Sequence, residues 1–313
     1  MKLKGQPAIL LGNGINRYKQ QQNVQSWESL LFSLPNTNVE ERKKITAVLK
    51  DVKGISYPDF FDALCFKSDE THETLKKVIA DEVQGWKGEN HHRKLLDFAM
   101  KNNIPILTTN YDLSLISEEL WKKIRKITHR TGRDAHKPIV PKEKAGFWRY
   151  PFYHYYSDKM VANVCDEFAI WHMHGICCYP KSLIIGATDY GLLISNLKER
   201  LFDKKTNELL IDGDLKNSWI DIFFHKDLYV IGLALDSQET SLRWLLIQRM
   251  RYIRQKGLNL RTTYIALKGE TSKGKNFFLS SIGISLKEVN AYSDIYDSWF
   301  CERLNSRNSI GSE

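Results

Sequence analysis

Short runs of apolar residues alternate along this chain with longer stretches in which apolar residues recur with helical spacing. The apolar runs are rich in β-branched residues and have the length of buried strands. They span Ala8 to Leu11, Ile104 to Leu107, Ala169 to Met173, Leu183 to Ile185, Leu228 to Ile231 and Thr263 to Leu267. Strands that alternate with helices predict an α/β fold with a doubly wound, Rossmann-like parallel sheet and helical insertions.

Several amphipathic helices are predicted between the first two of these strands. They span Ser26 to Leu34, Glu40 to Leu49, Pro58 to Phe66, Glu73 to Gln84 and His91 to Lys101. The segment from Asp236 to Glu239 has the residue types of a capping box and predicts a later helix. The apolar residues of that helix that we expect to be buried are Leu242, Leu245, Leu246 and Ile253.

No internal repeat and no long linker rich in proline and glycine divides the chain. We therefore expect residues 1–313 to form one domain, with helical insertions at about 35–103 and 115–168. Of the 313 residues 42% are hydrophobic, which is enough for a large core. No run of roughly 18 apolar residues occurs, and the run from Ala8 to Leu11 is too short for a signal peptide. These features predict a soluble, cytoplasmic protein without membrane contact.

Cysteine spacing bears on disulfides and metal sites, and net charge bears on the kind of partner. The five cysteines lack paired CxxC spacing, which predicts reduced thiols rather than disulfides or a four-cysteine zinc site. The formal net charge of +9 would suit a polyanionic partner. Acidic and basic residues are interspersed, however, so charge alone does not identify the partner.

Two glycines directly follow the first predicted strand, in the segment from Gly12 to Arg17. Glycines let a backbone approach closely, and the amides of such a turn can face a phosphate. The segment lacks the third glycine of a GxGxxG motif, so an ordinary turn between a strand and a helix explains it equally well.

Polar residues also end two other predicted strands, at Thr108 to Asp112 and at His172 to Gly175. The carboxyl ends of parallel strands meet at one edge of a sheet, where α/β proteins bind ligands. We therefore expect these segments and the glycine segment to converge on one site. A histidine there can transfer a proton at neutral pH, but His174 could equally serve only to bond backbone groups in a tight turn.

Taken in chain order, these segments resemble the sirtuin-like superfamily, and more closely its bacterial defence-associated branch. That family carries a Gly-Ala-Gly-x-Ser loop, a Thr-x-Asn-x-Asp strand end and a His-Gly turn in the same order. Trp27 to Leu31, Gly186 to Tyr190 and Ile231 to Asp236 are similar to further segments of the branch. The resemblance extends over most of residues 8 to 250.

The resemblance implies that NAD is the substrate and that hydrolysis of its nicotinamide–ribose bond releases nicotinamide and ADP-ribose. By this similarity Asn110 would orient the ribose or the attacking water, His174 would act as general base at the ribose hydroxyls, and Asp112 would help to hold nicotinamide. The NAD-binding residues would be Gly12, Asn13, Gly14, Ile15, Asn16, Thr109, Gly232, Leu233, Ala234 and Asp236.

Several residues depart from the family pattern. Asn13 and Asn16 replace the usual alanine and serine of the first loop, and Leu233 and Ala234 lack the hydroxyl groups common at the later strand end. The zinc-binding cysteine pairs of protein-deacylating sirtuins are also absent. Their absence disfavours deacylation, and we expect no metal.

Members of this branch act in antiphage defence by NAD depletion and often form homo-oligomers. They are often paired with a separate protein, such as a HerA-like DNA-translocating ATPase or an Argonaute-like protein, and others occur in Thoeris-type systems. The resemblance implies partners of this kind, with nucleic acid contacted through the partner. A different class of function stays open, in which the chain is a catalytically silent scaffold that binds DNA or a partner ATPase.

Three other segments have more than one interpretation. His172 and His174 with Cys177 and Cys178 could be combined into a metal site, but small buried apolar side chains explain the cysteines better. Residues 269–275 nearly match a P-loop, yet Asn276 replaces the hydroxyl that meets magnesium, which favours a solvated loop. Residues 122–156 are first basic and then aromatic, which suits a lid, an oligomer contact or a nucleic-acid surface.

Overall fold

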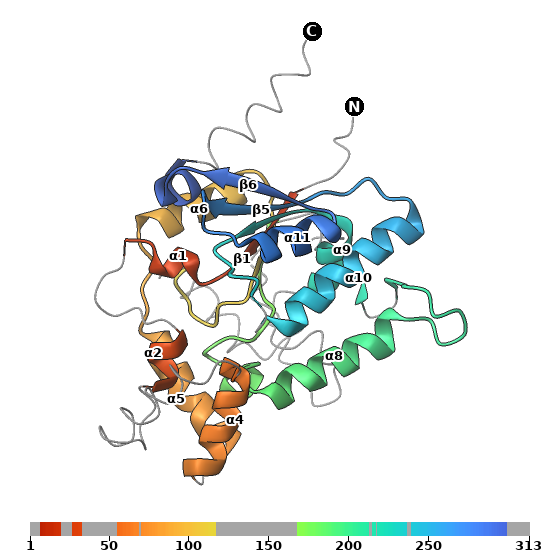
Figure 1. The fold of residues 1–313 in the computed structure, drawn as a ribbon. Helices are drawn as coiled ribbons and strands as arrows, with labels where there is room; N and C mark the ends of the chain where they lie inside the picture. The colour runs from red at the N-terminus through yellow and green to blue at the C-terminus, as the bar shows by residue number, and fades with distance from the viewer. Residues whose placement is uncertain are drawn as a thin grey trace, which may run out of the picture.

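A parallel β-sheet forms the centre of the molecule (Figure 1). The computed structural model describes residues 7–19, 27–32, 55–68, 70–116, 168–212, 215–216, 218–236 and 239–298. Within these ranges six strands form one sheet in the order β3-β2-β1-β4-β5-β6, and all of its strand pairs are parallel. The strands are β1 (Pro7–Leu11), β2 (Ile106–Thr108), β3 (Ile170–His172), β4 (Asp227–Ile231), β5 (Thr262–Leu267) and β6 (Ile284–Val289). This is the strand order of a doubly wound fold, which confirms the predicted α/β, Rossmann-like class.

Helices cover both faces of the sheet. They are α1 (Gly14–Arg17), α2 (Trp27–Phe32), α4 (Tyr57–Ser68), α5 (His72–Gln84), α6 (Asn90–Lys101), α8 (Ala187–Leu201), α9 (Trp219–His225), α10 (Thr240–Lys256) and α11 (Lys273–Ser281). A 3-10 turn, η3, spans Pro180–Ser182, and a π-helical turn, η5, spans Asp294–Ser298. The alternation of side chains along β1 explains the two layers, because Leu10 packs with α8, α9 and α10, whereas Ile9 packs with α6 and η5.

A third apolar cluster lies beside the sheet, where α2, α4 and α5 gather at the lower left of Figure 1. Its buried residues include Phe61 of α4 and Ile79 of α5. Tyr111, which follows β2, and Ile185, which precedes α8, join the same cluster. These helices therefore pack against the chain at the carboxyl edge of the sheet, next to the predicted site.

The predicted strands agree with the structure except at two places. Leu183 to Ile185 is not a strand, because its residues run past the sheet edge, where Ile184 N donates to His174 O at 2.8 Å. Apolar side chains there fill the clusters on either side, which gives the sequence of a buried strand without the pairing. Strand β6 was not predicted, because it lies at the edge of the sheet and only its first residue, Ile284, is fully buried.

The helix predictions from Ser26 to Leu34, from Pro58 to Phe66, from Glu73 to Gln84 and from His91 to Lys101 are confirmed by α2, α4, α5 and α6. The helix predicted from Glu40 to Leu49 lies outside the described residues. Helices α4 to α6 fall within the predicted insertion at 35–103. The insertion predicted at 115–168, including the basic and aromatic residues 122–156, lies almost entirely outside the described part of the chain.

The capping box predicted at Asp236 to Glu239 is wrong. Helix α10 begins at Thr240, and its N-cap is Glu239, whose side chain makes no capping hydrogen bond. Leu235, after β4, has a φ of 47°, and the helix starts later than the residue types indicate. The predicted buried face is confirmed at Leu242, Leu245 and Leu246, while Ile253 is half-buried.

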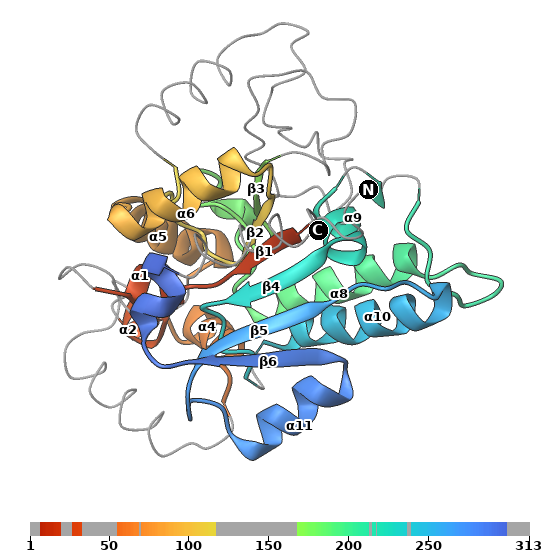
Figure 2. The same ribbon diagram turned by 90° about the horizontal axis from the view of Figure 1, so that it is seen from above.

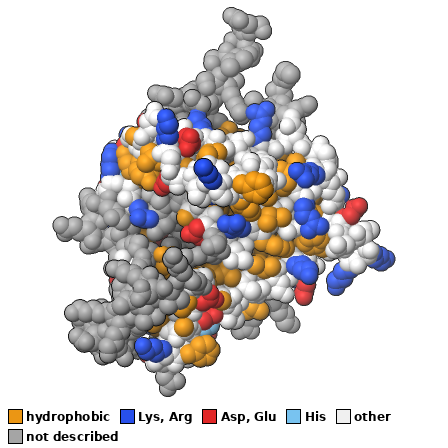
Figure 3. Space-filling model, in the orientation of Figure 1, with side chains coloured by type: hydrophobic (Ala, Val, Ile, Leu, Met, Phe, Trp, Pro, Cys, Tyr) orange, Lys and Arg blue, Asp and Glu red, His pale blue; other side chains and the backbone are white. Residues whose placement is uncertain are grey.

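Basic side chains are spread over the face drawn in Figure 3, with hydrophobic and acidic side chains between them. Figure 2 shows the ribbon of Figure 1 from above, with the strands side by side in the order β3-β2-β1-β4-β5-β6. Among the helices that the structure describes, none combines the length and the apolar character needed to cross a bilayer.

Candidate functional site

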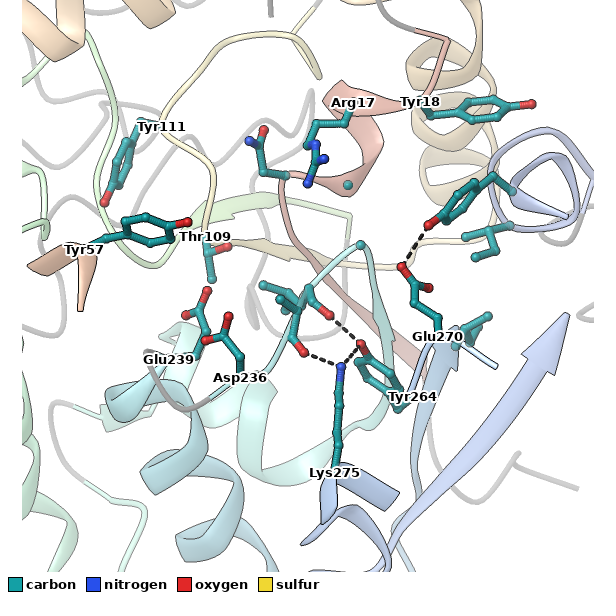
Figure 4. Close-up of a pocket in the computed structure, with 18 of the residues that line it drawn as sticks. Arg17, Tyr18, Tyr57, Thr109, Tyr111, Asp236, Glu239, Tyr264, Glu270 and Lys275 are labelled. Atoms are coloured by element: carbon teal, nitrogen blue, oxygen red, sulfur yellow. Dashed lines mark hydrogen bonds between the residues drawn. The ribbon is translucent and has the colours of Figure 1, made fainter. Parts of the chain in front are cut away.

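A cavity of about 600 Å³ lies at the carboxyl ends of β1, β4 and β5 (Figure 4). From β1 the sheet continues through β2 on one side and through β4 on the other, so this is the switch point of the strand order. Doubly wound folds bind their ligands at that place, and the volume is that of a pocket for a small ligand or cofactor. The predicted site residues that line the cavity are Asn13, Gly14, Thr109, Gly232, Leu233, Ala234 and Asp236.

The two glycines after β1 allow a close crossing with the chain after β4. Gly12 N donates to Ile231 O and Gly14 N donates to Gly232 O, both at 2.9 Å. A Cβ atom added to Gly12 would lie 2.5 Å from Gly232 O, and one added to Gly14 would lie 2.6 Å from the Cα of Gly232. Gly232 itself has a φ of 65°. We call Gly12, Gly14 and Gly232 the glycine crossing.

Replacing Gly14 with alanine is expected to lower the free energy of unfolding by about 1–3 kcal/mol, because the added methyl group meets backbone that cannot move aside. Gly191, inside α8, has nothing within 4 Å of an added Cβ, so Gly191→Ala is the matched control and should stabilise by about 0.5–1 kcal/mol. Urea denaturation of both variants tests this. Equal effects of the two substitutions would contradict the close crossing.

The side chain of Asn16 makes four hydrogen bonds, two of which connect the first loop to the residues after β2. Its Nδ2 donates to Asn13 Oδ1 at 2.9 Å and to Asp112 Oδ2 at 2.7 Å. Its Oδ1 accepts a hydrogen bond from Ser114 Oγ at 2.9 Å and lies 2.9 Å from Nε2 of His92. An asparagine side chain offers two donors and one oxygen acceptor, so every polar group of Asn16 is satisfied. These bonds give Asn16 a structural role in the loop that follows β1.

His92, at the start of α6, completes this network in its neutral form. Its Nδ1 accepts from Glu89 N at 3.0 Å, so Nε2 carries the proton and donates to Asn16 Oδ1. Burial, with a smaller contribution from neighbouring His91, lowers the pKa of His92 to about 3. His91 in turn contacts Ile15 O through Nε2 at 2.8 Å. From the sequence, both histidines are predicted only to begin a helix. Nothing in their spacing indicates that they bond to Ile15 and Asn16 in the loop after β1.

The three predicted catalytic residues are buried, and none of them lines the cavity. Asn110 Nδ2 donates to Gly12 O at 3.3 Å. Burial raises the pKa of Asp112 despite its hydrogen bonds. The neighbours Thr109 and Tyr111 do line the cavity. Among the predicted NAD-binding residues, Gly12, Ile15 and Asn16 do not line the cavity.

His174 is separated from the cavity by Tyr190. The imidazole of His174 meets the ring of Tyr190 edge-on, with centroids 5.4 Å apart, and Tyr190 lines the cavity. Burial lowers the pKa of His174 to about 4, so the imidazole is neutral at pH 7. The backbone carbonyl of His174 accepts a hydrogen bond from Ile184 N. Tyr190 is therefore the cavity-lining side chain that His174 contacts.

Several charged residues in the cavity were not predicted as site residues. Arg17 points into the cavity from α1 and Lys275 points into it from α11 (Figure 4). Lys275 Nζ donates to Tyr264 Oη at 2.6 Å and also to Ala234 O. Its segment was predicted to be a solvated loop, but Ser272 caps α11 there and turns Lys275 inward. A serine three residues before Lys275 was the available signal for a helix start.

Glu239 brings a second carboxylate next to Asp236 at the same cavity. Burial and then the charge of Asp236 raise the pKa of Glu239 from 4.5 to about 7. Protein stability should therefore fall as the pH rises from about 4.5 to about 7, because the unfolded chain releases this proton first. The free energy of unfolding should fall by about 1–2 kcal/mol over this range. The loss is smaller than for a group wholly removed from water, because part of the Glu239 side chain faces the cavity.

Melting temperatures of the wild type and of Glu239→Gln across pH 4 to 8 measure this effect. The variant should lack the loss, so the difference between the two proteins should grow up to about pH 7 and then stay constant. Glu199→Gln, at an exposed position of α8, is the control. A difference that does not change with pH would contradict the raised pKa of Glu239.

No group of three or more histidine, cysteine, aspartate or glutamate side chains that could hold a metal ion occurs among the described residues. The histidines of the considered metal site have other contacts. His172 Nδ1 lies 2.8 Å from Asn110 O, and His174 packs on Tyr190. Cys177 is buried in the cluster with α2, α4 and α5.

The strand order, the glycine crossing and the cavity at the switch point define a doubly wound α/β protein with a candidate ligand site at the carboxyl edge of its sheet. No protein-family model matches the sequence, and no characterised protein does.

Proposed function

We propose that this protein is an NAD glycohydrolase, which hydrolyses the bond between nicotinamide and ribose to release nicotinamide and ADP-ribose. The observation that carries the proposal is the cavity at the switch point, because five of the six segments that resemble the NAD-hydrolysing family contribute residues to its lining, all except His172 to Gly175. Gly14, Thr109 and Gly232 line the cavity, and Asn110 and His174 are buried.

The chemistry requires a site that positions the ribose and stabilises positive charge. Nicotinamide leaves as a neutral group, so the ribose passes through a state with oxocarbenium character. Asp236 and Glu239 supply carboxylates at the cavity, and a neutral His174 is the form that can accept a proton from a ribose hydroxyl. For His174 and the ribose to meet, Tyr190 has to turn aside.

Nicotinamide release from NAD by the purified protein tests the proposal. It is measured by liquid chromatography, with the chain alone and together with the product of a neighbouring gene, because the resemblance includes enzymes that act with a partner. The expected result is a one-to-one yield of nicotinamide and ADP-ribose. Absence of both products under either condition would contradict the proposal.

A second function is favoured by one observation, the burial of the predicted catalytic side chains. Asn110, Asp112 and His174 are at most 5% exposed, so the described arrangement binds a ligand more readily than it reacts with one. In this alternative the chain is a catalytically silent scaffold that recognises a nucleotide, DNA or a partner ATPase. Calorimetric binding of ADP-ribose with no nicotinamide release would support the silent scaffold.

The biological role follows from the enzyme proposal. A cytoplasmic NAD glycohydrolase would deplete NAD, and we propose antiphage defence as its setting, with homo-oligomerisation and a HerA-like ATPase or another defence protein as partners. Light scattering of the purified chain measures its oligomeric state. A monomer at every protein concentration would contradict the expected homo-oligomer.

A further inference from the structure

The backbone amides at the glycine crossing are already used within the protein. Gly12 N and Gly14 N donate to carbonyl groups at the end of β4, and Asn16 N and Arg17 N donate to Asn13 O at 3.1 and 3.2 Å. An anionic group in the cavity therefore cannot rely on these amides in the way that glycine-rich phosphate loops do. Side chains at the cavity are therefore the candidates for recognising it.

Tyr296, in the π-helical turn η5, places its hydroxyl group at the glycine crossing. A Cβ added to Gly14 or to Gly232 would lie 2.5 or 2.8 Å from Tyr296 Oη. The residue is 3% exposed and lines the cavity. Within the described part of the chain, no hydrogen bond of Tyr296 Oη is found. A phenol has one donor to offer, and here it is unused next to the switch point.

The environment of Tyr296 keeps it protonated and in position. Burial raises the pKa of Tyr296, so the hydroxyl stays a hydrogen-bond donor. Its ring packs on Tyr18, with centroids 5.0 Å apart. The next residue, Asp297, accepts hydrogen bonds from Tyr18 Oη at 2.6 Å and from Lys19 Nζ at 2.7 Å. Turn η5 is thus fixed to the loop that follows β1.

Arg17 supplies a positive charge near the same point. Its guanidinium group points into the cavity and acts electrostatically on Tyr296. Among the described residues Arg17 forms no ion pair. Lys275 is the other cation of the cavity, but Tyr264 and Ala234 already accept two of its hydrogen bonds. A guanidinium group with free donors suits a phosphate better.

We infer that Arg17 and Tyr296 bind the diphosphate of the nucleotide ligand, with Arg17 as the countercharge and Tyr296 Oη as a hydrogen-bond donor at the glycine crossing. The inference rests on the proposed function for the ligand class only, since it requires a nucleotide diphosphate but no hydrolysis. The phosphate-binding contacts then come from α1 and from a turn near the C-terminus.

Calorimetric titration with ADP-ribose and with adenosine, which lacks the diphosphate, tests the inference. For ADP-ribose, Tyr296→Phe should weaken binding about tenfold, and Arg17→Gln about 10- to 100-fold. Binding of adenosine should change by no more than about twofold. Matched controls are Tyr252→Phe, which removes a buried hydroxyl bonded to His225, and Arg254→Gln on the exposed side of α10. Thermal melts check the folding of each variant.

Unchanged ADP-ribose affinity in both variants would overturn the inference, because neither side chain would then contribute to binding. Tighter binding by Tyr296→Phe would also overturn it, because the hydroxyl group would then hinder the ligand. Equal losses for ADP-ribose and adenosine would overturn it as well, as would a wild type that does not bind ADP-ribose. Selective losses in a protein that releases no nicotinamide would support the inference while contradicting the enzyme proposal. Nicotinamide release with unaltered ADP-ribose affinity in the variants would support the enzyme proposal while contradicting the inference about Arg17 and Tyr296.

Discussion

Asn110→Ala and His174→Ala are expected to lower the rate of nicotinamide release by at least about 100-fold each. The expected range for a lost general base is about 100- to 10,000-fold. Loss of a group that orients ribose or water lowers the rate by about 100-fold, the lower end of that range. Both side chains are buried and neither lines the cavity, so neither substitution should remove the cavity itself. Initial rates at saturating NAD provide the measurement.

Two control substitutions separate catalysis from folding. Asn102→Ala removes a side-chain hydrogen bond to Phe98 O at the end of α6, and His225→Ala removes an imidazole paired with Asp221 on α9. Neither position lines the cavity, so both controls should keep the wild-type rate. If Asn110→Ala and His174→Ala are folded and turn over NAD as fast as these controls, the assignment of the catalytic residues is wrong.

Asn16→Ala is expected to destabilise the protein by about 3–5 kcal/mol. The substitution removes hydrogen bonds to four side chains, and two of the partners left behind, Asp112 and His92, are buried ionisable groups. A buried polar group without its partner costs about 1–3 kcal/mol, and more when it carries charge. Unfolding in urea, followed by circular dichroism, measures the change.

The matched control is Asn13→Ala, because the side chain of Asn13 takes part in the same network through a single bond to Asn16. Its loss should cost only about 0.5–1.5 kcal/mol. A wild-type midpoint for Asn16→Ala, or equal effects at the two positions, would show that the network does not stabilise the loop after β1.

Local pattern predicted most of the fold. The strands β1, β4 and β5 each contain a continuous apolar run, which makes them recognisable without knowledge of their neighbours. Strand β6 escaped prediction because its edge position leaves it half exposed. The strand predicted from Leu183 to Ile185 is wrong. The side chains of these residues are buried in two clusters, and such burial gives the same apolar run as pairing in a sheet.

The candidate site was predictable only in part. Thr109, Asn13 and Gly232 follow strands, and the parallel order of the sheet brings strand ends together, so their place at the cavity follows from the pattern. Tyr296 lies 282 residues after Gly14 in the chain, and no local pattern indicates that its hydroxyl reaches that glycine.

The sequence by itself determined the class of the fold, five of its six strands and the polar segments that end several of them, because hydrophobic periodicity and turn residues act over a few neighbouring positions. Only the tertiary structure decided which of those polar groups face the cavity and which bond to each other instead. It placed Asn16 in a saturated network, used the glycine amides to join β1 to β4, and set Tyr190 over His174. These outcomes depend on contacts between distant residues, which compete for a limited number of hydrogen-bonding groups as the chain packs.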